Sequence, residues 1–334
     1  MVNNNKKIFE AKGVMIMNLK WNSKIDQYKF KIMKMTSLLV CAAVIGLAPV
    51  KLNAQVKVSA KAEFPAFSTE GHRGARGLMP ENTIMAMKKA IDLGITTLEM
   101  DTHVTKDGEV VVTHDDYLSP AFMLDANGKE LPPGDAKKYP VYQMTYAELK
   151  SFDLGSKYYP AFPQQEKIKT FIPRLEELID SVQLYLEQSG KKPMFYNIET
   201  KCGPEGDGVL NPDPETFVKL LMGVLEKKGI TPFVVIQSFD KRTLQVLNKK
   251  YPEVRTSYLV ANTKSFEENM ADLGFSPFIL SPYYKMVNAE LVRKCHNQEI
   301  KVIPWTVNSA KEIQELKDLK VDGIISDYPN LLVH

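Results

Sequence analysis

Short β-rich runs alternate with helix-patterned segments over most of the chain, and this alternation limits the fold more than any other feature. The runs are "TTLEMDTHV", "MFYNIET", "PFVVIQSF", "TSYLV", "PFILSP", "KVIPWTV" and "DGIISD". Helical patterns lie at residues 81–93, 213–229, 240–250, 264–272, 288–297 and 309–318. Such alternation predicts a parallel sheet with helical crossovers. With 44% apolar residues, the chain can build one α/β domain, a (β/α)8 TIM barrel of roughly 250 residues.

Polar or aromatic side chains stand at the ends of the predicted strands. They are Glu199, Gln237, Ser281, Trp305 and Asp327. The carboxyl ends of all strands lie on one face of a parallel barrel, so we expect these side chains to surround a common mouth.

The segment after Asp101 breaks the alternation, because it is too short for a crossover helix. Its "TKDGEV" carries the Asp-Gly pair typical of a two-residue hairpin loop. With Asp107 and Gly108 as the loop, Asp101 lies opposite His114, and Glu99 points the same way as Asp101. With "FSTEGH" as the first strand there are nine candidates for eight positions, and "VVVTH" is the surplus one. The alternative, an irregular loop between parallel strands, brings His114 to the same mouth. A small insertion, residues 115–172, follows the hairpin.

The stretch "GHRGARGLMPENT", residues 71–83, sets His72 and Arg73 in a glycine turn at the end of the first strand. The predicted mouth then also holds the carboxylates of Glu99, Asp101 and Glu199. Confined carboxylates repel one another, so a hard divalent cation, Ca²⁺ or Mg²⁺, is the expected cofactor.

The basic side chains near these carboxylates indicate the kind of substrate. Arg73 and Lys201 add positive charge suited to phosphate oxygens. Two histidines, His72 and His114, provide one group to take a proton from the attacking oxygen and one to protonate the leaving oxygen. We expect His103 to be structural and to point to the face opposite Glu99 and Asp101.

These motifs resemble those of the glycerophosphodiester phosphodiesterase family. The matching stretches are "GHRGARGLMPENT", "LEMDTHVTKDGEVVVTHD", "IPRLEELI", "NIETK", "QSFD", "PWTVN" and "DGIISDYP", which run from about residue 68 to 331. The resemblance implies a TIM barrel that hydrolyses glycerophosphodiesters, a class of small molecules, to sn-glycerol 3-phosphate and an alcohol.

The same resemblance implies roles for individual residues. It makes His72 and His114 the acid/base pair, and Glu99, Asp101 and Glu199 the metal ligands. Substrate-binding positions by the resemblance are Arg73, Lys201, Glu81, Asn82, Gln237 and Trp305. Residues 115–172 match a substrate-facing insertion, but "HDDYLSPAFML" lacks the arginine-threonine pair often found there, so the contacts to the alcohol are not specified.

Residues 1–54 form a separate region, and 55–334 are the predicted catalytic domain. The run "TSLLVCAAVIGLAPV", flanked by lysines and "KLNAQ", predicts a secretory signal cleaved after Ala54, so the product is periplasmic or secreted and not stably inserted in a membrane. An uncleaved anchor is the alternative. The preface 1–32 is better explained by an upstream start codon than by a folded element.

Residues 1–54 hold nine of the 43 basic and two of the 40 acidic residues, so residues 55–334 carry a net negative charge. This charge indicates that the protein has no nucleic-acid partner.

Three functions remain open at this stage. The first is hydrolysis of glycerophosphodiesters, and the second is the same chemistry on a lysophospholipid, of the phospholipase D type. An apolar track for an acyl chain would distinguish them; "AFML" and "KYYPAF" offer only an interrupted one. The third is an extracytoplasmic protein that binds phosphate esters without turnover, which would not need two histidines.

Overall fold

The structure is a computed structural model that describes residues 61–333, all within one compact unit. The predicted signal and its cleavage site lie outside the described residues. Among residues 61–333, no helix combines the length and the apolar character that crossing a bilayer requires.

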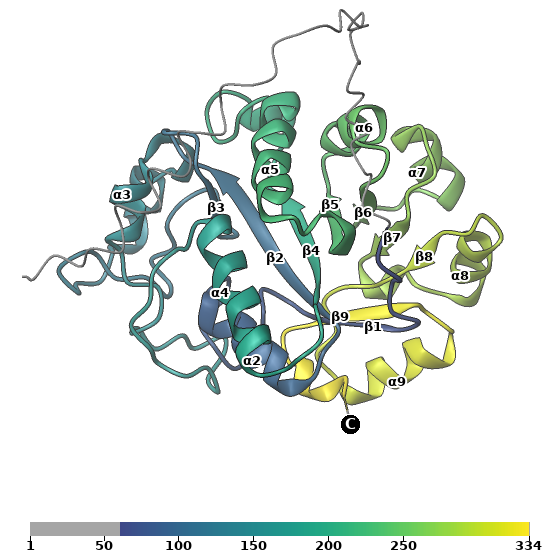
Figure 1. Ribbon diagram of the computed structural model, residues 1–334, viewed down its shortest axis with the longest axis horizontal. Coiled ribbons are helices and arrows are strands. Elements are labelled where there is room, and N and C mark those ends of the chain that lie inside the picture. Colours follow the sequence, from purple (N-terminus) through teal and green to yellow (C-terminus); the bar gives the residue numbers. More distant parts are fainter. Residues whose placement is uncertain (1–60, 334) are drawn as a thin grey trace, which may run out of the picture. The chain divides into compact units, whose positions relative to one another are not determined.

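Eight parallel strands form a nearly closed barrel, in the order β8-β7-β6-β5-β4-β2-β1-β9 (Figure 1). Backbone hydrogen bonds from Asp322 to Val302 and from Ile325 to Pro304 bring the two end strands together. The predicted (β/α)8 barrel is therefore confirmed. The strands are β1 (Ser68–Gly71), β2 (Thr97–Val104), β4 (Phe195–Thr200), β5 (Val234–Ser238), β6 (Arg255–Val260), β7 (Ile279–Pro282), β8 (Lys301–Val302) and β9 (Gly323–Ser326).

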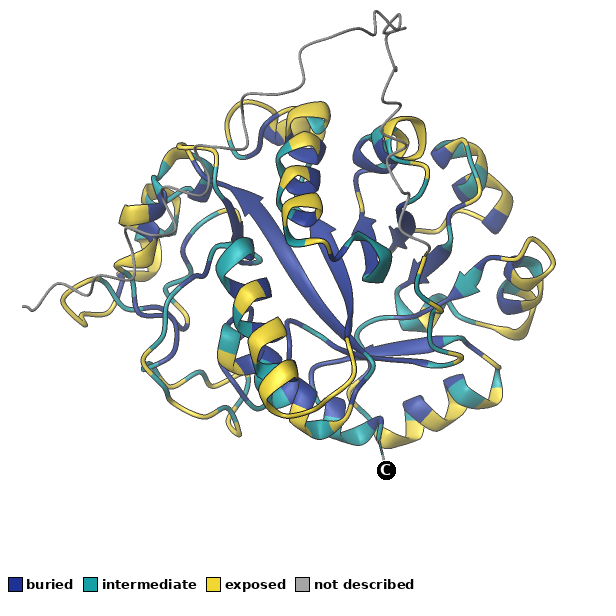
Figure 2. Ribbon diagram, viewed as in Figure 1, coloured by how far each residue is buried: buried dark blue, intermediate teal, exposed yellow. Residues whose placement is uncertain are grey.

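Helices follow the strands and cover the outside of the barrel, with buried residues on their inner faces and exposed ones outside (Figure 2). The helix predicted at 81–93 begins later, because Asn82 has a positive φ and the Thr83 side chain caps the first turn by accepting from the Ala86 amide. The helices are α2 (Ile84–Leu93), α3 (Tyr146–Lys150), α4 (Leu175–Gln188), α5 (Pro214–Lys228), α6 (Lys241–Lys250), α7 (Phe266–Leu273), α8 (Ala289–His296) and α9 (Ala310–Asp318).

The barrel interior has a polar half and an apolar half. Val235, Ile279, Ile303 and Ile325 form the apolar cluster. The polar half holds buried side chains of β1, β2, β4 and β5, namely Ser68, Glu70, Thr97, Glu99, Asn197 and Gln237. Alternate residues of the same strands, such as Leu98 and Met100, pack outward against the helices. The carboxylates of the predicted site thus continue a polar layer that reaches into the barrel.

The predicted hairpin is present, but its register differs by one residue. Strand β3 (Val110–Val112) runs antiparallel to β2, and His103 pairs with Val111. The loop contains three residues, because Thr105 pairs with Glu109 and Gly108 adopts φ +81°. The backbone carbonyl of Asp101 therefore accepts from the Thr113 amide, so Asp101 lies opposite Thr113 and does not face His114.

Residues 115–172 have a small buried core of their own. Leu118, Val141, Leu149 and Ile172 are among its fully buried side chains, and β3 contributes Val111 to it. Short 3₁₀ turns (Pro133–Lys138 and Val141–Gln143) and α3 are its regular elements. The predicted insertion is thus packed onto the end of the hairpin and next to the mouth.

Candidate active site

Three carboxylates meet where β2 and β4 end. Parallel pairing of the two strands sets Asp101 beside Glu199, and Glu99 lies one alternate position earlier. One oxygen from each of the three lies within 4.8 Å of the others, and all three residues are buried. This arrangement brings together the three residues predicted to bind the metal.

The electrostatics of the three carboxylates differ. Burial and the nearby charge of Asp101 raise the pKa of Glu99 well above its usual value. Burial also raises the pKa of Glu199, although Lys201 opposes this. For Asp101, burial is outweighed by the charges of His114, Arg73 and Lys201, which hold its pKa below the usual range. Two buried carboxyl groups that resist ionisation without a cation, Glu99 and Glu199, together with the ionised Asp101, are a donor set that fits Ca²⁺ or Mg²⁺.

Both oxygens of Glu99 are held by neutral donors. The Arg73 backbone amide donates to Oε2 at 2.6 Å, and Gln237 Nε2 donates to Oε1 at 2.7 Å. Arg73 adopts a positive φ of 50° in this glycine turn. The next residue has to be glycine, because Gly74 lies against the backbone of Ala86 and leaves no room for a Cβ atom. The turn therefore aims a backbone donor at the carboxylates.

The predicted substrate-binding residues divide into two groups. Lys201 Nζ lies 3.0 Å from Glu199 Oε1 and 3.8 Å from Asp101 Oδ1, close to the cluster. Glu81 and Asn82 lie behind the carboxylates and, like Lys201, do not line the cavity: Glu81 accepts from Arg73 Nη1 at 2.6 Å, and Asn82 Nδ2 donates to Asp101 Oδ2 at 2.9 Å. Through these hydrogen bonds Glu81 orients the Arg73 side chain, and Asn82 orients the Asp101 carboxylate.

The His72 ring is held by Asp327, which was not among the candidate site residues. Its Nδ1 lies 2.6 Å from Asp327 Oδ1, and Asn308 Nδ2 donates to the other Asp327 oxygen at 2.7 Å. Burial lowers the pKa of His72 despite Asp327, and contact with His72 lowers that of Asp327 to about 2 against the effect of burial. A carboxylate only accepts, so His72 carries its proton on Nδ1 and leaves Nε2 as a base. The pairing of β9 with β1 places Asp327 there.

His114 also has a carboxylate on Nδ1, from its neighbour Asp115 at 2.7 Å, but it is more exposed than His72.

The expectation that His103 points to the face opposite Asp101 is wrong. The two residues are two positions apart in β2, so their side chains lie on the same face. His103 is fully buried, burial lowers its pKa to about 4, and its Nε2 lies 3.1 Å from the His114 carbonyl oxygen. That contact fixes the backbone where His114 leaves the hairpin.

A cavity of about 230 Å³ joins these residues at the mouth. Trp305 and Gln237 line it as predicted, although Gln237 is 1% exposed and also accepts from Asn197. The cavity is lined by His72, Arg73, Arg76, Glu99, His114, Glu199, Gln237, Phe239, Leu259, Trp305, Thr306 and Ile325. Arg76 and Phe239 were not among the candidate site residues, although "GHRGARG" and "QSFD" contain them.

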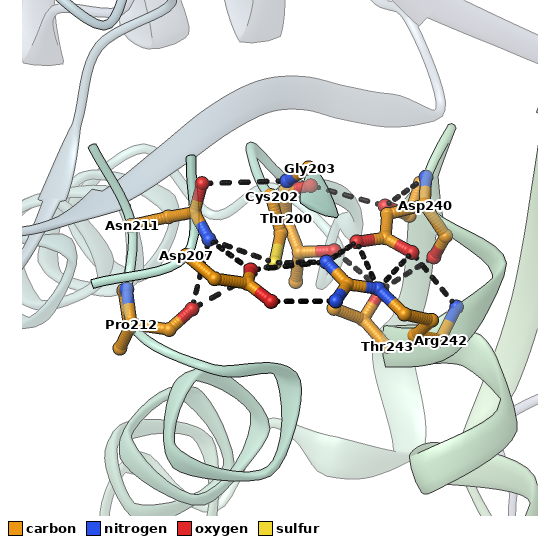
Figure 3. A network of polar contacts seen from close by, with 10 residues as sticks. Thr200, Cys202, Gly203, Asp207, Asn211, Pro212, Asp240, Arg242 and Thr243 are labelled. Carbon is orange, nitrogen blue, oxygen red and sulfur yellow. Dashed lines mark hydrogen bonds and ion pairs between the residues drawn. The ribbon is translucent and has the colours of Figure 1, made fainter. Parts of the chain in front are cut away.

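A network of charged side chains fixes the loop that follows Lys201 (Figure 3). Arg242 donates to both oxygens of Asp207 at 2.6 and 3.0 Å, and its Nη2 donates to Asp240 at 2.6 Å. Asn211 Nδ2 donates to Asp207 and lies 3.3 Å from the Cys202 sulfur. The β4–α5 loop is thereby tied to the start of α6, next to Glu199 and Lys201.

Comparison with known proteins gives a consistent result. A family model, the glycerophosphoryl diester phosphodiesterase family, matches residues 72–331. A glycerophosphodiester phosphodiesterase of Caldanaerobacter subterraneus is 30% identical over 79% of this chain and 95% of its own. Human lysophospholipase D GDPD1 is 27% identical over 78% of this chain and 83% of its own.

Solved structures share the barrel. A crystal structure assigned to the same family, from Silicibacter pomeroyi, is 30% identical, with a TM-score of 0.70 over 81% of this chain and 95% of its own. An Oleispira antarctica phosphodiesterase is 26% identical, with a TM-score of 0.61 over 78% and 93% of the two chains. That structure is a complex with the product sn-glycerol-3-phosphate.

Proposed function

The chain belongs to the glycerophosphoryl diester phosphodiesterase family, and from that premise we propose that it hydrolyses glycerophosphodiesters to sn-glycerol 3-phosphate and an alcohol. The observation that carries the proposal is a pair of histidines that line one cavity together with Glu99 and Glu199, next to the buried Asp101. Each histidine has a carboxylate on Nδ1, which leaves both Nε2 atoms for proton transfer.

The roles of individual residues follow from their contacts. His72, neutral because burial lowers its pKa, takes a proton from the attacking oxygen, and His114, nearer to solvent, protonates the leaving oxygen. Arg73 and Lys201 bind the phosphate oxygens. Glu99, Asp101 and Glu199 would hold one Ca²⁺ or Mg²⁺ ion, and when bound it would offset negative charge on the phosphate.

The residues around this centre have supporting roles. Glu81 and Asn82 hold Arg73 and Asp101 in place. Gln237 orients Glu99, and Trp305 offers an apolar edge to the glycerol carbons. The ring of Trp305 is itself fixed, because its Nε1 donates to the Ser281 carbonyl at 2.9 Å and Phe239 packs edge-on at 5.3 Å.

A second candidate, lysophospholipase D activity, is favoured by the resemblance to human lysophospholipase D GDPD1. The apolar lining near Trp305 consists of Phe239, Leu259 and Ile325. A cavity of about 230 Å³ suits a headgroup better than an acyl chain. We therefore rank the water-soluble substrate first. A protein that only binds phosphate esters would have no use for two carboxylate-held histidines.

Export is part of the proposal. Residues 1–54 are proposed to act as a leader cleaved after Ala54, so that residues 55–334 work in the periplasm or outside the cell on deacylated lipids. Products of lipid deacylation would then be hydrolysed before uptake.

The test is a turnover assay with glycerophosphocholine, glycerophosphoethanolamine and a lysophosphatidylcholine, each with and without excess chelator. We expect turnover of the first two, little of the third, and loss of activity in chelator that Ca²⁺ or Mg²⁺ restores. Glu199→Gln keeps the shape but removes a ligand charge, so its activity should need a higher cation concentration. Full activity in chelator, or an unchanged cation requirement in the variant, would refute the metal assignment.

A further inference from the structure

Arg76 presents two unused hydrogen-bond donors to the active-site cavity. Its Nε donates to Glu81 Oε2 at 2.6 Å, and its side chain is 19% exposed. No hydrogen bond or ion pair within residues 61–333 engages Nη1 or Nη2, while the residue lines the cavity. Arg73 differs, because its Nη1 is taken by Glu81.

The guanidinium of Arg76 is held in a fixed place from two sides. Glu81 fixes one edge, and the ring of Phe162 lies under the plane, with Cζ 4.5 Å from the ring centroid. Phe162 belongs to the insertion, whose Gln165 Nε2 donates to the Arg76 carbonyl at 2.8 Å. An arginine whose planar fork is held in advance loses less side-chain entropy when it binds an anion.

The position of Arg76 in the barrel indicates which part of a substrate it faces. It follows β1, and Leu259 is in β6, which lies four strands from β1 in either direction around the ring. With Phe239, Trp305 and Ile325, Leu259 makes the apolar lining of the cavity. When the phosphate of a glycerophosphodiester lies over the three carboxylates, its two substituents, glycerol and the alcohol, extend in different directions. The side chains of His114 and Arg76 are 31% and 19% exposed, against 13% for His72, so an alcohol that departs past His114 toward solvent extends toward Arg76.

We propose that the free Nη groups of Arg76 bind an anionic group on the alcohol half of the substrate. The inference rests on the proposed function and adds a substrate class to it: glycerophosphodiesters whose alcohol carries a carboxylate. The bidentate pair that guanidinium forms with a carboxylate matches two adjacent free Nη donors. The insertion then contributes to specificity through Phe162, which fixes the orientation of that fork.

Glycerophosphoserine and glycerophosphoethanolamine make a matched pair of probes, because they differ by one carboxylate. The wild-type enzyme should have a kcat/KM roughly tenfold higher for glycerophosphoserine. Arg76→Gln should bring the ratio of the two values near one by lowering the value for glycerophosphoserine. Arg76→Lys, which keeps the charge and loses the fork, should fall between. A general loss of folding would affect both substrates equally, so the ratio reports the contact.

Two further variants separate this contact from surface charge. Phe162→Leu removes the stacking ring and should reduce the preference, whereas Arg293→Gln, an exposed arginine on α8, should leave it unchanged. Equal losses on both substrates in an Arg76→Gln variant whose circular dichroism and melting temperature match the wild type would place Arg76 on the shared glycerophosphate half and overturn the inference, with the proposed function intact. A wild-type enzyme without preference would overturn it too. Failure to hydrolyse any glycerophosphodiester would instead refute the proposed function, and the inference with it.

Discussion

Gln237 and Glu99 are joined inside the barrel by a hydrogen bond of 2.7 Å from the amide Nε2 to Oε1. The Gln237 oxygen accepts in turn from Asn197 Nδ2 at 3.1 Å, and the same nitrogen donates to Glu70 Oε2 at 2.7 Å. The Glu70 oxygen that faces Asn197 accepts from Asn197 Nδ2, which sets the direction of both amides. The Gln237 NH₂ group then faces Glu99, as an ionised ligand carboxylate requires.

The first prediction concerns that hydrogen bond. Gln237→Leu leaves one Glu99 oxygen without its donor, so the affinity for Ca²⁺ or Mg²⁺ should fall about tenfold, the scale of outer-shell effects at metal sites. Calorimetric titration of the cation measures this without any substrate. Gln245→Leu is the control, since Gln245 also loses a hydrogen bond, to the Leu273 carbonyl, on the outside of the barrel. Equal affinities in all three proteins would contradict the assignment.

The second prediction follows from Glu70, whose pKa burial raises from 4.5 to about 7. Between these values the folded carboxyl keeps its proton and the unfolded one does not. Unfolding releases a proton there, so the free energy of unfolding falls as pH rises from about 4.5 to 7, by roughly 3 kcal/mol for this group alone. Glu70→Gln cannot ionise and should lose stability less steeply over that range.

Urea unfolding at pH 5, 6, 7 and 8, at one fixed Ca²⁺ concentration, measures the effect. The stability of Glu70→Gln relative to wild type should rise with pH and level off above pH 7. Glu226→Gln, an exposed position on α5, should follow the wild type. A difference between Glu70→Gln and wild type that stays constant across these pH values would show that Glu70 is ionised throughout.

The sequence predicted the parts of the site that depend on strand order. The family, the barrel and the phosphoric diester hydrolase class are confirmed, and Glu99, Asp101 and Glu199 do converge. Period-two alternation and the common direction of parallel strands are enough for that result. The same alternation, counted correctly, would have placed His103 on the Asp101 side.

Two kinds of detail could not be predicted. Asp-Gly is compatible with loops of two or three residues, so the register of Asp101 against the returning strand depended on Gly108 adopting a positive φ as the third loop residue. The support of Arg76 by Phe162 joins a glycine turn to a distant insertion, and no local pattern encodes that contact. Asp327 is different: it was seen at a strand end, and closure of β9 on β1 implies its position beside His72.

The third prediction concerns the leader. If residues 1–54 are an export signal, protein recovered from outside the cytoplasm should begin near Gln55, as N-terminal sequencing or intact mass would show. Replacing Ala54 by a bulky residue should slow cleavage, because signal peptidases require small side chains there. Recovery of the chain with residues 1–54 intact would favour the uncleaved anchor.

The fourth prediction separates the two histidines. The glycerol 2-hydroxyl lies next to phosphorus, so its oxygen can attack while the bond to the alcohol oxygen breaks, leaving a cyclic phosphate that water opens. In the first step His72 accepts the hydroxyl proton and His114 gives one to the departing alcohol, and they exchange roles in the second. The 2.6 Å contact with Asp327 stabilises the charge that His72 acquires. Loss of either should lower the rate about 10² to 10⁴-fold.

A glycerophosphodiester with p-nitrophenol as its alcohol distinguishes the roles, because p-nitrophenolate departs without a proton. His114→Ala should recover most of its rate on this ester relative to glycerophosphocholine, whereas His72→Ala should stay slow on both. Asp327→Asn should resemble a weaker His72→Ala, since the asparagine no longer stabilises a charged imidazole. Equal losses on both substrates for both histidine variants would rule out divided roles. Recovery by His72→Ala alone would show that His72 is the acid and His114 the base. Because the ester still needs an attacking oxygen, only the acid can be bypassed, and the comparison therefore identifies which histidine faces the alcohol.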